Sequence, residues 1–150
     1  MIQRIQTIYL LLAVACGVAL CFLPIGTAGP GAIITAFTAT ANGAPIDTGM
    51  PAWMPAVFLI MGIALRLVAV FGYKNRPNQL RTCRSALIAD ICLATLAGVQ
   101  IWQVGKAMPA TDALPHPAAA LLLLAVAFTL LAMRGIRSDE RLVRAADRLR

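Results

Sequence analysis

Residues 53–104 read WMPAVFLIMGIALRLVAVFGYKNRPNQLRTCRSALIADICLATLAGVQIWQV, and this stretch decides the fold. It contains two long apolar runs, residues 53–73 and 84–104, separated by a short polar segment that is rich in Lys and Arg. A helix needs about 20 mostly apolar residues to cross roughly 30 Å of hydrocarbon. Both runs meet this length, so the stretch predicts two antiparallel membrane-spanning helices joined by a basic loop.

Two further apolar runs, residues 5–25 and 117–133, flank this stretch and predict two more spans, followed by a polar tail at 134–150. The chain has 150 residues, of which 60% are apolar and 13% charged. Soluble domains are about 45–50% apolar and about 25% charged. The composition therefore excludes a soluble enzyme domain, a disordered tail and a secreted disulfide scaffold. We predict an all-α membrane protein in which residues 1–150 form one domain, a four-transmembrane-helix bundle.

The distribution of basic residues predicts the orientation of these spans. All but two of the 13 Lys and Arg residues precede the first span, lie between the second and third, or follow the fourth. Because cytoplasmic loops carry the Lys/Arg excess, both termini are expected in the cytoplasm. Trp53 and Trp102 fall at the other membrane interface, on the side away from the cytoplasm, and Trp residues are enriched at membrane interfaces. The net charge of +7 is therefore interpreted as a topology signal rather than a nucleic-acid-binding surface.

The segment between the first two spans differs in composition from the rest of the chain. Residues 26–52 are rich in Gly, Pro and Thr and contain no Lys or Arg. Asn42-Gly43 is the strongest short signal for a hairpin turn. The sequence thus predicts a small extracytoplasmic β-hairpin, with an irregular loop as the alternative. An isolated hairpin is marginal in water, so it must pack as a lid on the bundle or dock a partner.

Two charged residues, Arg66 and Asp90, lie inside the predicted second and third spans. They are equally far in sequence from Asn78, near the centre of the intervening loop, and therefore lie at similar depth. A charge at membrane depth costs a few kcal/mol or more. We predict that Arg66 and Asp90 pair with each other. In the alternative interpretation Asp90 handles protons or ions, with Thr95, Gln100 and Gln103 extending a polar face.

The tail carries the signals of a separate interfacial helix. Gly135 is expected to interrupt the fourth helix, and Ser138 is a good N-cap with acidic residues in the following turn. A basic amphipathic helix at this place suits a membrane surface with anionic headgroups, and docking to an acidic partner is the alternative. The basic face predicted to contact lipid or a partner comprises Lys74, Arg76, Arg81, Arg84, Arg137, Arg141, Arg144 and Arg148.

No sequence pattern indicates catalysis, a metal or a cofactor. The only His is His116, and a carboxylate four residues earlier, Asp112, without a nucleophile nearby is weak evidence for catalysis. The four Cys residues form no CxxC pair, and a lone His cannot complete a zinc site with them. The tail has neither the aromatic platforms nor a recognisable module for nucleic acid. We therefore predict a protein that is not an enzyme, has no catalytic residues, metal or cofactor, and does not bind nucleic acid.

Three stretches resemble a family of uncharacterised four-span bacterial inner-membrane proteins that is classified only as a domain of unknown function. They are the opening MIQRIQTIYL at 1–10, the basic loop at 73–84, and the ending at 139–150. The resemblance implies a place in the bacterial inner membrane and four retained spans, against the alternative that the first span is a cleaved signal peptide. It supplies no catalytic or binding residues.

The leading functional hypothesis is an accessory or scaffold subunit that presents a basic cytoplasmic face to anionic lipid headgroups or to a membrane protein partner. The alternative is a small transporter or channel subunit that uses Arg66 and Asp90. Such a subunit would act as a homo-oligomer, because four helices alone enclose little space. A third hypothesis is a membrane enzyme subunit without catalytic residues of its own.

Overall fold

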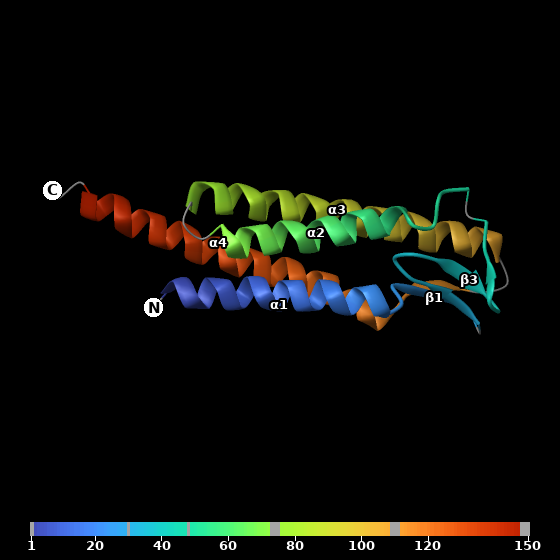
Figure 1. Cartoon of the computed structure of the whole chain (residues 1–150). Coiled ribbons are helices and arrows are strands. Elements are labelled where there is room, and N and C mark those ends of the chain that lie inside the picture. Colours follow the sequence, from blue (N-terminus) through green and yellow to red (C-terminus); the bar gives the residue numbers. More distant parts are fainter. Residues whose placement is uncertain (1, 30, 48, 73–75, 109–111, 148–150) are drawn as a thin grey trace.

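Four helices of alternating direction form the body of the molecule in this computed structural model, which describes residues 2–29, 31–47, 49–72, 76–108 and 112–147. They are α1 (Ile2–Phe22), α2 (Met54–Phe71), α3 (Arg76–Ala107) and α4 (Ala120–Asp147), the last preceded by the short 3-10 helix η1 (Pro117–Ala119). The start of α1 and the end of α4 lie at one end of the bundle, here called the terminal end (Figure 1). A small β-sheet lies at the other, the sheet end.

All four helices are long and apolar enough to cross a membrane. Their outer surfaces are apolar as well: Ile8, Val68, Ile91 and Leu123, one on each helix, are all more than half exposed. Large contiguous apolar surface is rare on a soluble monomer but is what hydrocarbon chains contact in a bilayer. The predicted bundle of four membrane-type helices is therefore confirmed.

The helices pack in a square. Helix α1 contacts α2 and α4, and α3 contacts the same two helices, so α2 and α4 lie diagonally across the bundle. A glycine allows one of these close contacts, because a Cβ atom at Gly17 would lie 2.9 Å from Ile63 Cγ1 on α2. Small residues at helix interfaces allow this kind of close approach in membrane proteins.

Helix α3 begins before the apolar run that predicts the third span. It starts at Arg76, so Arg81 and Arg84 lie within a helix rather than within a loop. Pro77 does not prevent this start, because the first turn of a helix has no partner for the N–H group that proline lacks. The basic residues of this segment are therefore held on a regular helical surface.

Helix α4 is continuous from Ala120 to Asp147, so the predicted break at Gly135 and the separate tail helix capped by Ser138 are wrong. The glycine has a packing role instead. A Cβ atom at Gly135 would lie 2.9 Å from Gln6 Cγ on α1. The side chain of Gln6 passes over Gly135 and donates a buried hydrogen bond of 2.9 Å from Nε2 to Asp139 Oδ2. Packing against α1 thus keeps the tail segment helical.

The two connections at the sheet end form one antiparallel sheet of order β4-β3-β2-β1-β5. Its strands are β1 (Gly26–Ala28), β2 (Ala32–Ile34), β3 (Ala39–Ala41), β4 (Ala44–Pro45) and β5 (Ala113–Pro115). Asn42 and Gly43 join β3 to β4 with φ angles of 51° and 82°, the positive values that a type I′ turn requires. Strand β5 comes from the α3–α4 connection and pairs with β1, so the sheet extends beyond the expected hairpin.

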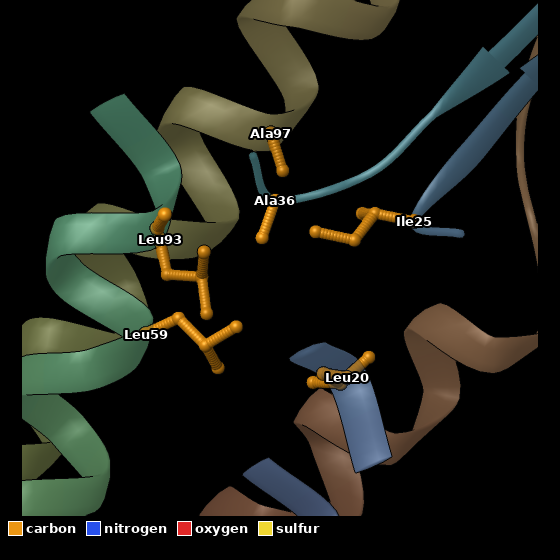
Figure 2. Close-up of a cluster of buried hydrophobic side chains, with 7 residues drawn as sticks. Leu20, Ile25, Ala36, Leu59, Leu93 and Ala97 are labelled. Carbon is orange, nitrogen blue, oxygen red and sulfur yellow. The ribbon is translucent and has the colours of Figure 1, made fainter. Parts of the chain in front are cut away.

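Among the described residues, buried apolar side chains form three clusters along the long axis of the molecule. One lies beneath the sheet and includes Ile34 of β2 and Val104 of α3, which fixes the sheet on α3. The next joins the sheet end to the helices, with Ile25 and Ala36 directed toward Leu59 and Leu93 (Figure 2). The third lies at the terminal end; its buried members are Leu10, Ala69, Cys83, Ala132, Met133 and Ile136.

Candidate functional site

A buried ion pair, together with a hydrogen bond from the same guanidinium, joins the helices α2, α3 and α4. Arg66 of α2 donates from Nη2 to Asp90 Oδ2 of α3, and the two side chains are only 2% and 5% exposed. Arg66 Nε also donates to Thr129 Oγ1 of α4 at 2.9 Å. The Thr129 hydroxyl in turn donates to the carbonyl oxygen of Ala125 at 2.7 Å. A single guanidinium thus connects α2 to its neighbour α3 and, across the diagonal, to α4.

The backbone of α2 leaves room for this pair at Gly62. A Cβ atom there would lie 3.1 Å from Arg66 Nη1 and 3.4 Å from Asp90 Oδ1. The pair also lies between two apolar clusters, because Leu59 precedes Arg66 on α2 in one cluster and Ala69 follows it in the other. In such low-dielectric surroundings an unpaired charge is very costly, and a well-bonded pair is held firmly.

The polar face that the transport alternative requires does not continue from the pair through Thr95. The Thr95 side chain is exposed and donates back to the carbonyl oxygen of Ile91 at 2.8 Å. Gln100 is fully buried and donates from Nε2 to the carbonyl oxygen of Ala52 at 2.9 Å. Among the residues described, Gln100 Oε1 and Gln103 Oε1 are buried without a hydrogen-bond partner.

The predicted basic face is found in part on a terminal-end basic surface, which we define as the exposed residues Arg81, Arg84, Arg134, Arg137 and Arg141. The first two belong to α3 and the other three to α4. Lys74 and Arg148 lie outside the described residues, as do the side chains of Arg76 and Arg144. Arg134 was missing from the predicted face, although its spacing of three residues from Arg137 could have indicated it.

One carboxylate near this surface, that of Asp139, is directed inward. Asp139 is 9% exposed and accepts the hydrogen bond from Gln6, while Glu140 is half-buried. The sequence predicts both acids in the first turn of a separate tail helix and does not indicate the contact between Gln6 and Asp139. Asp139 therefore adds no outward negative charge to the terminal-end basic surface.

A pocket of about 440 Å³ lies within this surface and is here called the α4 pocket. Its described lining residues all belong to α4: Leu130, Met133, Arg134, Arg137, Ser138 and Arg141. The lining combines two apolar side chains, three guanidinium groups and one hydroxyl. It offers hydrogen-bond donors and positive charge suited to an anion, next to an apolar wall.

The side chain of His116 has a structural role. Its Nδ1 accepts a hydrogen bond of 3.1 Å from the backbone N–H of Ala118 and so caps η1. Within the described part of the chain, no group of three or more His, Cys, Asp or Glu residues could hold a metal ion.

These features define a class: a small helical membrane protein with an internal ion pair and a basic surface at one end. The chain belongs to the family named domain of unknown function (DUF4293), whose model matches residues 2–149. Membership of a family known only as a domain of unknown function, which the resemblance implied, is thus confirmed. No curated protein and no solved structure matches the chain.

Proposed function

We propose that the protein is an accessory or scaffold subunit of the bacterial cytoplasmic membrane. Its terminal-end basic surface would dock the acidic face of a membrane protein partner at the depth of the anionic headgroups. The observation that carries this proposal is the direction of the charges at this end. The five arginines of the surface are exposed, whereas Asp139 is buried against α1. A surface of one sign steers and selects partners of the opposite sign.

The proposed orientation places the terminal end in the cytoplasm and the sheet outside. The basic excess at the terminal end supports this orientation, because cytoplasmic segments retain Lys and Arg. Lys106, at the sheet end, lies 3.6 Å from the centroid of the Trp102 ring. Trp residues favour the membrane interface, which fits a boundary near this level of α3.

In this proposal the Arg66–Asp90 pair holds the bundle together and does not transport a solute. Transport through Asp90 would require the carboxylate to leave a guanidinium that is also bonded to Thr129. The low exposure of both side chains and the outward direction of Thr95 support the structural role. A buried pair that loses one partner is left with an uncompensated charge, so the pair resists opening.

Purification from the native membrane in mild detergent tests the proposal. We expect a partner protein at near-stoichiometric amount with the wild type, measured by quantitative mass spectrometry. The variant Arg81→Gln/Arg84→Gln/Arg137→Gln/Arg141→Gln should retain about tenfold less of it, because several charge-assisted contacts are lost together. Its elution volume should stay unchanged, since all four side chains are exposed.

The control is Lys106→Gln, which removes one charge at the sheet end and should keep the partner. Two results would contradict the scaffold proposal. One is a wild-type protein that purifies without a stoichiometric partner. The other is a partner retained equally by the wild type and the fourfold variant.

A further inference from the structure

We propose that the α4 pocket binds the phosphate group of a single anionic phospholipid, with Arg134, Arg137 and Arg141 as its ligands. The inference deepens the proposed function, since it rests on the same terminal-end basic surface and names a lipid for one part of it. It concerns a defined site rather than the general attraction between basic residues and anionic membranes.

The exposed face of α4 changes its chemistry at one position. Residues that follow one another at alternating intervals of three and four positions lie on one face of a helix. Along α4 such a series is Leu123, Ala127, Leu130, Arg134, Arg137 and Arg141, and every member is exposed. The series is apolar as far as Leu130 and entirely basic from Arg134 onward. A lipid has the same order along its length, with acyl chains followed by a charged headgroup.

The pocket has the chemical groups that a phosphodiester requires. A guanidinium can donate two parallel hydrogen bonds to phosphate oxygens, and three guanidiniums line the pocket together with the Ser138 hydroxyl. Its volume of about 440 Å³ is in the range of small-molecule sites, roughly 300–1,000 Å³. The Gln6–Asp139 hydrogen bond directs the carboxylate of Asp139, the residue next to Ser138, toward α1.

The apolar wall selects a lipid over a soluble anion. Leu130 is 51% exposed and Met133 is buried, and both line the pocket on the side of the helix from which the apolar series approaches. Inorganic phosphate would leave the exposed side chain of Leu130 without a partner, whereas the glycerol and first acyl carbons of a phospholipid would cover it. The basic residues begin where the apolar run of α4 ends, and in the proposed orientation this boundary lies at the depth of the headgroups.

Native mass spectrometry of the full chain in mild detergent, titrated with phosphatidylglycerol or phosphatidylcholine, tests the site. We expect the wild type to prefer phosphatidylglycerol. Arg137→Gln/Arg141→Gln should bind it about tenfold more weakly, since two charge-assisted phosphate contacts are removed. The matched control Arg81→Gln/Arg84→Gln removes the same charge at the same end but outside the pocket, and should change binding by less than about threefold.

Equal losses in the two double variants, or a wild type without preference for phosphatidylglycerol, would refute a defined site and leave only diffuse attraction. Displacement of phosphatidylglycerol by an excess of inorganic phosphate would refute the assignment to lipid. If Arg137→Gln/Arg141→Gln does not elute as folded protein, the variant Arg134→Lys/Arg137→Lys tests the proposal instead. This variant keeps the positive charge and loses only the two parallel hydrogen bonds that a guanidinium can donate. That variant must bind phosphatidylglycerol more weakly, and unchanged binding would refute the proposal.

This test and that of the scaffold proposal can fail separately. Refutation of the lipid site leaves partner retention by the basic surface unaffected. A pocket that binds phosphatidylglycerol in a protein that purifies without a partner would refute the scaffold proposal alone.

Discussion

Replacement of Asp90 by Ala is expected to reduce folded protein in the membrane to a small fraction of the wild-type amount. The substitution leaves the Arg66 guanidinium buried at 2% exposure with no carboxylate beside it. Removing one partner of a buried pair costs about 3–5 kcal/mol, which is a large part of a typical stability of about 5–15 kcal/mol. Quantitative membrane blots and fluorescence-detected size-exclusion chromatography of a tagged chain measure the effect.

The double variant Asp90→Ala/Arg66→Ala should recover part of the folded protein, because it removes the uncompensated charge together with the pair. Asp112→Ala serves as the control, since Asp112 is an exposed carboxylate at the sheet end. It should leave the amount of folded protein unchanged. A wild-type level of Asp90→Ala alone would contradict a structural role for the pair.

Replacement of Gly26 by Ala should have the second-largest effect, because it separates the sheet from α3. A Cβ atom at Gly26 would lie 2.7 Å from Ile101 Cγ1 and 2.9 Å from Ile101 Cδ1. Forcing extra atoms into a packed interface costs about 1–3 kcal/mol. We expect a lower midpoint temperature of thermal aggregation in detergent. Size-exclusion chromatography after heating measures this midpoint.

Shortening the opposing side chain should reverse this loss, so Gly26→Ala/Ile101→Ala is expected to be more stable than Gly26→Ala alone. Gly98→Ala on α3 is the matched control, because a Cβ atom there meets nothing within 4 Å. Its stability should equal or exceed that of the wild type, since Ala favours a helix over Gly by about 1 kcal/mol. No difference between the Gly26 and Gly98 variants would contradict the packing of β1 on α3.

The helices and the approximate position of the ion pair were predictable because they depend on local sequence. Long apolar runs identify the helices, and the equal distances of Arg66 and Asp90 from Asn78 place them at similar depth. Thr129 was not predictable as a partner of Arg66. A threonine in a helix commonly bonds to its own backbone, and its second contact depends on how α4 is rotated against the diagonal helix.

The tail and the sheet show the opposite case, in which tertiary contacts override local signals. Gly135 and Ser138 are typical of a helix end and a helix start, yet the hydrogen bond from Gln6 to Asp139 holds one continuous helix. Strand β5 at 113–115 has only three residues and acquires its conformation by pairing with β1. Neither contact can be read from a short window of sequence.

The proposed function requires a chain that crosses the membrane four times, with the basic end in the cytoplasm. Labelling with a membrane-impermeant maleimide tests this in a background with Cys16, Cys21, Cys83 and Cys92 replaced by Ala. Single cysteines at the exposed positions Ala44 and Arg141 report the sheet end and the terminal end. We predict that Ala44→Cys is labelled in intact spheroplasts and Arg141→Cys only in inverted vesicles. Labelling of Arg141→Cys from outside, or of both positions from one side, would contradict it.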